Sequence, residues 1–277
     1  MKQVYLPDGS SMPQLGQGTW QMGEDDNKYE REIAGLRHGI ELGMTLIDTA
    51  EMYADGKAEN IAGNAAKPFA RESLYICDKV YPKNADRKHI YSSVERSLKL
   101  LGTDYIDLYL IHWPADGWQQ AWDDLQEIYA SGRAKAIGVS NFQKHHIDEL
   151  LTHSDVVPAV DQVESSPQFT NQELIDQLRA KGIHTEAWSP LGGTGGNLLS
   201  NPVLAGIGAK YGKSAAQVVI RWHIQRGIVV LPKSTHAERI KQNFEVFDFN
   251  LSVDDMTAIS AINTGKRNGA DPDNFNF

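Results

Sequence analysis

Strand-like apolar runs alternate with helix-like stretches along nearly the whole chain. Eight apolar runs begin near Leu15, Thr45, Leu74, Tyr105, Ala134, Val156, Ile183 and Ile228. The amphipathic stretches between them include 28–43, 87–101, 143–151 and 171–181. Eight strand–helix units in one chain predict an α/β fold in which a parallel sheet closes into a (β/α)8 barrel.

The length of 277 residues suits one barrel with small additions, because such a barrel needs about 250 residues. Neither a linker nor a shift in composition divides the chain, so we expect a single domain over residues 1–277. A turn signal at Asp8–Gly9 predicts an N-terminal β-hairpin. Helical stretches near 201–212 and 214–226 fill the longest connection, and 252–262 predicts an extra C-terminal helix.

A doubly wound open sheet is the competing architecture. That fold usually carries a GxGxxG phosphate-binding turn after its first strand. Here Gly16, Gly18 and Gly23 follow the wrong spacing. The later cluster Gly192–Gly196 lacks the Lys-Ser/Thr ending of a P-loop. The glycine pattern therefore disfavours the open sheet.

The charge and the cysteine content limit which partners and which cellular compartment can be expected. A net charge of −9 argues against nucleic acid and anionic membranes as partners, and no run of 18 apolar residues is present. The N-terminus has no apolar signal sequence. The single cysteine, Cys77, cannot form an intrachain disulfide and is interpreted as a buried small hydrophobe rather than a reactive thiol. We therefore expect a cytoplasmic protein.

Four ionisable residues follow or end neighbouring strand-like runs. Asp48, Lys79 and His112 close three consecutive runs, and Tyr53 follows Asp48 in the next loop. In a (β/α)8 barrel the carboxyl ends of the strands form the active face, and neighbouring strands lie about 5 Å apart. We therefore expect the four side chains to meet at one end of the barrel.

The residue types suit proton delivery to a carbonyl group. The charge of a buried Lys79 beside Asp48 favours the phenolate form of Tyr53, which helps a phenol act as an acid near neutral pH. The imidazole of His112 can orient a carbonyl oxygen by hydrogen bonding. Such a site fits hydride transfer to an aldehyde or ketone.

Over essentially its whole length the sequence resembles the aldo-keto reductases. The motifs that carry the resemblance are LPDGSSMPQLGQGTW (6–20), LIDTAEMY (46–53), LYLIHWP (108–114), KAIGVSNF (135–142), VDQVESSPQF (160–169), EAWSPLG (186–192) and LPKSTHAERIKQN (231–243). The nearest subgroup is that of bacterial and fungal reductases of small carbonyls and of 2,5-diketo-gluconate. The resemblance places the family's catalytic tetrad on Asp48, Tyr53, Lys79 and His112.

The resemblance also implies a nicotinamide cofactor and its contacts. Ser140, Asn141 and Gln162 match residues that hold the carboxamide, and Trp188 matches the ring that stacks on the nicotinamide. Ser189 to Leu191, with the Gly-rich loop, match the segment over the pyrophosphate. The residues that match the surroundings of the adenosine ribose and its 2′-phosphate are Lys233, Ser234, Arg239 and Asn243. NADPH is therefore the expected cofactor, with NADH possible but weaker.

The basic segment 231–243 allows two interpretations from composition alone: a site for a small anionic ligand, or a solvated helix face. The resemblance favours the first. His236 departs from the family pattern there. A protonated His236 would add a third cation and favour NADPH at low pH, whereas a neutral one would offer a hydrogen bond to a ribose hydroxyl.

Aromatic and apolar residues on the same face are candidates for the substrate pocket. They are Trp20, Met22, Tyr53, Trp113, Phe275 and Phe277. All of them could equally be core or rim packing, but for Trp20 and Trp113, which flank the tetrad, the pocket is favoured. His145, His146 and His153 are interpreted as exposed helix residues, and the chain contains no metal-ligand spacing.

These observations predict an NADPH-dependent carbonyl reductase, with a small-molecule substrate and no nucleic-acid or membrane partner, acting as a monomer. Two alternatives remain. One is a non-catalytic barrel that keeps the cofactor site, which the intact tetrad disfavours. The other is a barrel isomerase or lyase without nicotinamide, which the Ser140–Asn141 and Lys233–Arg239 motifs disfavour.

Overall fold

The computed structural model describes residues 2–7, 9–85, 89–193 and 196–275. Its central sheet has eight strands, and each strand is parallel to its neighbours. In chain order they are β3 (Gly16–Gly18), β4 (Leu46–Asp48), β5 (Tyr75–Val80), β6 (Ile106–Ile111), β7 (Ala134–Ser140), β8 (Val160–Glu164), β9 (His184–Trp188) and β10 (Val229–Val230). The last strand returns to the first through a parallel bridge between Leu15 and Val230, so the sheet closes into the expected barrel.

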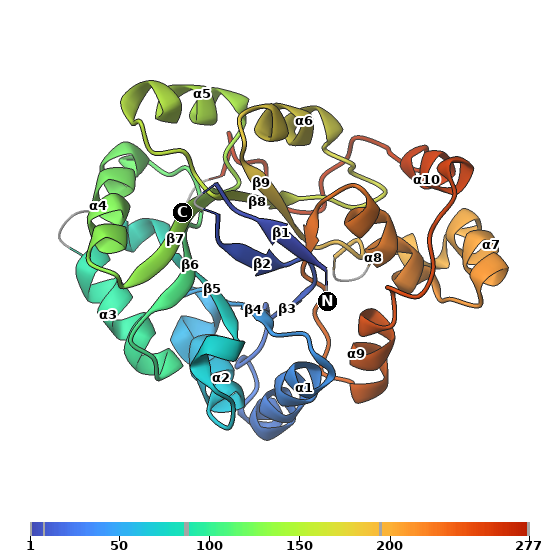
Figure 1. The fold of residues 1–277 in the computed structure, drawn as a ribbon, viewed down its shortest axis with the longest axis horizontal. Coiled ribbons are helices and arrows are strands. Elements are labelled where there is room, and N and C mark those ends of the chain that lie inside the picture. The colour runs from blue at the N-terminus through green and yellow to red at the C-terminus, as the bar shows by residue number, and fades with distance from the viewer. Residues whose placement is uncertain (1, 8, 86–88, 194–195, 276–277) are drawn as a thin grey trace.

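Helices surround the strands as an outer layer (Figure 1). They are α1 (Tyr29–Leu42), α2 (Lys57–Ala66), α3 (Ile90–Leu101), α4 (Trp118–Ala130), α5 (Lys144–His153), α6 (Gln172–Ala180), α7 (Pro202–Tyr211), α8 (Ala215–Gln225), α9 (Ala237–Phe244) and α10 (Val253–Ser260). Short 3-10 helices lie at Asp26–Lys28, Tyr53–Gly56, Arg71–Ser73, Pro82–Asn84 and Leu198–Ser200. Helix α7 lies outside the ring, beside α8 and α10. Helix α10, the last helix of the chain, is the expected extra C-terminal helix.

One strand begins later than the hydrophobic pattern predicts. The apolar run that starts at Val156 enters the sheet only at Val160. Pro158 has no amide proton for a strand hydrogen bond, and it restricts the residue before it. Val156 and Val157 are consequently exposed residues of the loop before β8.

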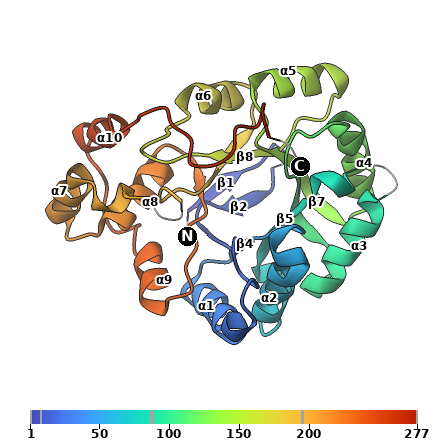
Figure 2. The ribbon, with the colours of Figure 1, turned by 180° about the vertical axis from the view of Figure 1, so that it is seen from behind.

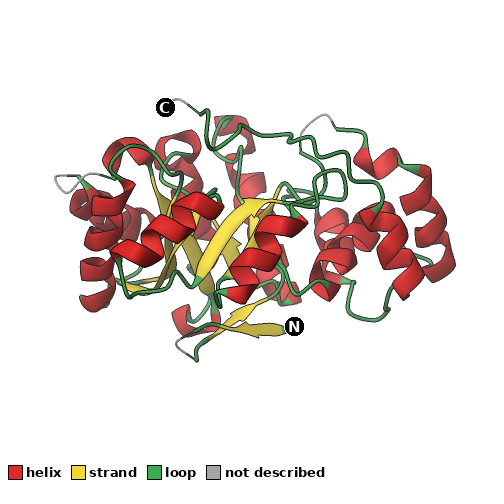
Figure 3. Cartoon of the chain, turned by 90° about the horizontal axis from the view of Figure 1, so that it is seen from above, coloured by secondary structure: helices red, strands yellow, loops and turns green. Residues whose placement is uncertain are grey.

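The hairpin formed by β1 (Gln3–Tyr5) and β2 (Ser11–Pro13) closes one end of the barrel, as Figures 1 and 3 show. Asp8, in the expected turn, lies outside the described residues. Leu6 and Met12 pack against barrel residues Leu46, Cys77 and Leu108 in one hydrophobic cluster. Cys77 is thus the buried hydrophobe that was predicted. The hairpin therefore covers the end of the barrel at which the strands begin, opposite the end at which they terminate.

The C-terminal segment crosses that opposite end. In Figure 2 it runs from α10 across β8 toward α5, and in Figure 3 it lies on the side of the barrel away from the hairpin. Thr264 is tied to Gln168 through both its amide and its hydroxyl group. The amides of Asn268 and Gly269 donate to the carboxylate of Glu164. The segment is therefore held over the strand ends by backbone and side-chain contacts.

Candidate active site

The four tetrad residues lie together at the carboxyl end of the barrel. Asp48 ends β4, Lys79 lies in β5, His112 follows β6, and Tyr53 begins a 3-10 helix. The Lys79 ammonium donates to the Asp48 carboxylate at 2.7 Å and to the Thr49 carbonyl oxygen at 2.6 Å. The Tyr53 ring centroid lies 5.2 Å from the Lys79 Nζ and 5.6 Å from the His112 ring centroid.

Burial sets the protonation states of this group. Burial raises the pKa of Tyr53 to about 12, although the nearby Lys79 charge acts in the opposite direction. The expected effect of Lys79 on the phenol is therefore present but smaller than the cost of desolvating a phenolate. Burial also lowers the pKa of Lys79, but the charges of Asp48 and Tyr53 outweigh it and raise that pKa above its ordinary value.

Burial and the Lys79 charge hold the pKa of His112 well below its usual range, so its imidazole is neutral. A neutral imidazole can donate one hydrogen bond without bringing a second positive charge beside Lys79. Its Nδ1 is buried without a hydrogen-bond partner among the described residues. The site thus presents a protonated phenol and a neutral imidazole.

The residues expected to hold the nicotinamide form a connected network beside the tetrad. Trp188 Nε1 donates to Asn141 Oδ1 at 2.9 Å, and Asn141 Nδ2 donates to the His112 carbonyl oxygen at 3.1 Å. The Ser140 hydroxyl donates to the Gln162 carbonyl oxygen at 2.8 Å. These hydrogen bonds connect the carboxyl ends of the four neighbouring strands β6, β7, β8 and β9.

Two of the expected cofactor residues have left-handed backbones. Asn141 has φ 65° and Ser189 has φ 49°, which are backbone conformations that residues other than glycine rarely adopt. Such strained residues are concentrated at functional sites, where the surrounding structure holds them in place. Leu191, two residues after Ser189, packs against the hydrophobic cluster that contains α8. Of the Gly-rich loop, residues 194–195 lie outside the described residues.

The basic segment lies at the start of α9. Lys233 and Ser234 precede the helix, Arg239 is an exposed residue of its first turns, and Asn243 is buried farther along it. Lys233 and Thr235 are among the lining residues of a cavity of about 270 Å³, which is lined by both bases and acids: Lys28, Arg31, Glu24, Asp25 and Glu32. The segment leads into the N-terminus of α9, and a helix N-terminus favours an anion because its amide groups and its dipole are positive.

Arg31 of α1 joins this segment, although it belongs to none of the sequence motifs of the cofactor site. Its Nη2 lies 2.9 Å from His236 Nε2 and 3.3 Å from the Thr235 hydroxyl. The charge of Arg31, followed by burial and the charges of Arg239 and Lys233, lowers the pKa of His236. The neutral form of His236 is therefore favoured. Because Arg31 lies about 200 residues from the segment in sequence, no local pattern could have revealed it.

The pocket candidates divide between the rim and the core. Trp20 is 49% exposed and packs edge-on against Tyr53, with ring centroids 4.9 Å apart. Trp113 stacks on Phe275 at 4.6 Å. Met22 is fully buried in the core cluster, which fits the alternative that it is a packing residue. Phe277 lies outside the described residues.

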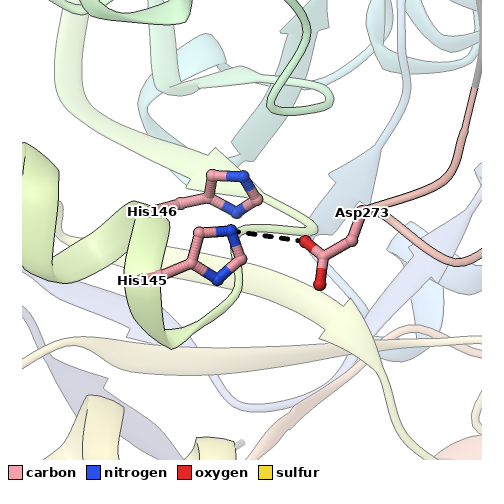
Figure 4. Close-up of side chains that lie close together, drawn as sticks. All are labelled: His145, His146 and Asp273. Carbon is pink, nitrogen blue, oxygen red and sulfur yellow. Dashed lines mark ion pairs between the residues drawn. The ribbon is translucent and has the colours of Figure 1, made fainter.

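The tail also contacts the first turn of α5. Figure 4 shows His145 and His146 beside Asp273, and His145 Nε2 lies 3.5 Å from Asp273 Oδ1. His146 is not the exposed residue that was expected: it is half-buried, and its Nδ1 accepts from the Gln143 amide as part of a capping box. We call the contact between His145 and Asp273 the tail latch.

Comparison with known proteins finds relatives that agree with the resemblance. A family model described as "Aldo/keto reductase family" matches residues 14–264. The chain is 44% identical to the "Uncharacterized oxidoreductase YtbE" of Bacillus subtilis, an alignment that covers 98% of this chain and 96% of the relative. It is 41% identical to a "Glyoxal reductase" of the same organism, covering 99% and 97%. It is 40% identical to "Methylglyoxal reductase DkgA" of Escherichia coli, covering 98% and 97%.

Solved structures agree with the same fold. A mutant of Gox0644 in complex with NADPH superposes with a TM-score of 0.90 at 34% identity, covering 100% of this chain and 99% of that one. An aldo-keto reductase of Bombyx mori in complex with NADP gives a TM-score of 0.89 at 31% identity, covering 96% and 94%. With matches of this extent in sequence and structure, the chain belongs to the aldo/keto reductase family.

Proposed function

We propose that this aldo/keto reductase reduces small aldehydes and ketones to alcohols with NADPH, and that Tyr53 is the proton donor. The observation that carries the proposal is the buried Lys79–Asp48 pair, which lies beside the Tyr53 phenol and the His112 imidazole. A site with this composition can protonate a carbonyl oxygen as negative charge develops on it.

When bound, NADPH would supply the hydride for the carbonyl carbon. His112 donates a hydrogen bond to the carbonyl oxygen and orients it. Tyr53 transfers its proton to the same oxygen, and Lys79 stabilises the phenolate that forms. Asp48 keeps Lys79 charged, since an unpaired ammonium at 0% exposure would tend to lose its proton.

The expected cofactor residues fit a nicotinamide dinucleotide. The indole of Trp188 offers a stacking surface, and its position is fixed by the hydrogen bond to Asn141. Ser140 and Gln162 lie at neighbouring strand ends next to the tetrad. Farther out, Arg31 reaches the segment before α9 through Thr235 and His236, and we place the 2′-phosphate there, beside Arg31 and Lys233. Arg239 and Ser234 of the same segment, and Asn243, complete the proposed adenosine site.

The substrate class follows from the rim and from the relatives. Trp20, Trp113 and Phe275 give the entrance an aromatic wall. The relatives described above include a glyoxal reductase and a methylglyoxal reductase, and both names refer to small dicarbonyls. We propose that dicarbonyls of this size are substrates here as well.

We further propose that residues 1–277 form one domain that acts as a monomer in the cytoplasm, without a nucleic-acid or membrane partner. The net charge of −9 supports the absence of nucleic-acid and anionic-membrane partners, and the single cysteine, which is buried, supports a reducing compartment. Within the described residues, none of the helices combines the length and the apolar character that a membrane crossing requires.

The test is an assay of glyoxal, methylglyoxal, larger aldehydes and keto-sugar acids with NADPH and with NADH. The reaction is monitored through the loss of absorbance of the reduced cofactor. A fluorescence titration with NADPH, without substrate, accompanies it. Turnover of small dicarbonyls with NADPH supports the proposal. Tight cofactor binding without turnover of any carbonyl would instead favour the non-catalytic barrel, and no cofactor binding would refute both.

A further inference from the structure

A second acid lies below the tetrad, and the proposed reaction gives it no role. Glu186 of β9 is fully buried, and its strand places it directly beside Gln162 of β8 in the parallel register. Its neighbours in the barrel interior are Asp48 and Cys77, with the Cys77 Sγ 4.0 Å from Glu186 Oε2. Burying a carboxyl group is costly, so its presence in the barrel interior calls for a reason.

The contacts of the Gln162 amide supply that reason. Its Nε2 donates to Asp48 Oδ1 at 2.7 Å and to Glu186 Oε2 at 2.9 Å. A carboxamide nitrogen carries only two protons, so both donors are used by the two carboxyl groups. The amide oxygen of Gln162 is the one polar atom of the group that is left for a ligand, and it can only accept.

We propose that Glu186 is a positioning residue that, with Asp48, fixes the Gln162 amide so that its oxygen faces the nicotinamide. The nicotinamide carboxamide has an NH₂ group that needs an acceptor, and a fixed oxygen selects one orientation of the ring. The inference rests on the proposed function, since it assumes that Gln162 contacts the cofactor.

The charge state of Glu186 is compatible with this role. Burial, followed by the charge of Asp48, raises the pKa of Glu186 to about 8. Below that pH the group is a neutral acid, and its carbonyl oxygen still accepts from Gln162. It therefore positions the amide without adding a second negative charge near Tyr53, while Lys79 stays paired with Asp48. The other oxygen, Oε1, has no hydrogen-bond partner among the described residues.

Two substitutions of similar size separate positioning from packing. Glu186→Met fills the space but removes one acceptor, which frees one Gln162 proton and leaves the amide held by Asp48 alone. We expect NADPH and NADH to bind about tenfold more weakly, by the same factor, because the contact does not involve the 2′-phosphate. Glu186→Gln keeps an oxygen that can accept from Gln162, and it is expected to recover most of the lost affinity.

The stereochemistry of hydride transfer is the second measurement. With NADPH deuterated on one face of the nicotinamide, the wild type should transfer from one face only. Glu186→Met should give a measurable fraction of product from the other face, because one of the contacts that fix the orientation of the ring is weakened. Asp161→Asn is the matched control. Asp161 is a buried acid of β8, and because it directly precedes Gln162 its side chain points to the other face of the strand.

A double-variant comparison completes the test. If Glu186 acts through Gln162, then Glu186→Met should cost almost nothing further in a Gln162→Met background. Full single-face transfer and unchanged cofactor affinity in Glu186→Met would overturn the inference. Wild-type protein that fails to bind NADPH would overturn the proposed function instead. If circular dichroism shows that Glu186→Met is unfolded, Glu186→Leu is measured in the same way.

Discussion

The Lys79 ammonium lies 2.7 Å from the Asp48 carboxylate inside the barrel, and Lys79 is not exposed at all. Only a charged partner and good hydrogen bonds make such burial tolerable. Lys79 has both, because the carbonyl oxygen of Thr49 accepts a second bond. Asp48 in turn accepts from Gln162, so the ion pair links the proposed acid site to the proposed cofactor site.

Breaking this pair should destabilise the fold as well as the reaction. Lys79→Met leaves Asp48 as an unpaired buried charge, which typically costs about 3–5 kcal/mol. Adding Asp48→Asn removes that charge, so the double variant should regain much of the lost stability but none of the turnover. Urea and thermal unfolding of the three proteins check this. A double variant that is less stable than Lys79→Met would show that the pair is not the source of the effect.

The pH dependence of alcohol oxidation should report the Tyr53–Lys79 relation. Oxidation requires the phenolate, whose fraction rises with pH up to the pKa of Tyr53, which burial raises to about 12. Lys79 counteracts that rise. In Lys79→Met, the rise of the oxidation rate with pH should therefore occur at still higher pH. Initial rates of wild type and variant over one pH series measure it, and superimposable normalised profiles would remove Lys79 from the control of Tyr53.

Cofactor preference should depend on Arg31 as well as on Arg239. Each is proposed to face the 2′-phosphate, and a hydrogen bond to a charged group is worth about 1.5–3 kcal/mol. Either change to Ala should thus narrow the preference for NADPH over NADH by roughly 10- to 100-fold. Arg37→Ala on the same helix is the control, because Arg37 contacts the Asn64 carbonyl oxygen instead. Dissociation constants for both cofactors decide the matter: equal weakening of NADPH and NADH would refute the phosphate assignment.

The tail should tune substrate affinity more than turnover. Phe275 stacks on Trp113, so Phe275→Ala should raise KM for aromatic aldehydes several-fold, with little change for glyoxal and in kcat. Asp273→Asn, which weakens the tail latch, should act in the same direction but less, since exposed ion pairs contribute about 0–1 kcal/mol. His153→Ala, at the far end of α5, is the control. Unchanged KM values in Phe275→Ala would place the tail outside the substrate path.

Repetition made the barrel predictable from the sequence. Eight apolar runs and their intervening amphipathic stretches carry the fold, and the strand ends then place Asp48, Lys79 and His112 together. The resemblance to a known family added Ser140, Asn141 and Trp188, which no spacing argument could have supplied. Exceptions arose where one local residue changed the outcome, as Pro158 did by delaying β8.

Residues that act through long-range contacts could not be predicted. Arg31 comes from α1 and meets α9 only because β10 returns to β3. Glu186 looks in the sequence like an ordinary polar residue of a strand, and its contact with Gln162 depends on the register of β8 and β9. Met22 shows why the pocket candidates stayed open in the sequence, because an apolar residue near the active face can also pack into the core.

Comparison of Tyr53→Phe with the wild type tests the central claim most directly. The change removes one hydroxyl group and keeps the ring that packs against Trp20. We predict that turnover of methylglyoxal with NADPH falls by roughly 10²–10⁴-fold, the usual value of a positioned general acid, while the NADPH dissociation constant changes less than about twofold. Turnover within a few-fold of wild type, at unchanged cofactor affinity, would contradict the assignment of Tyr53 as the proton donor.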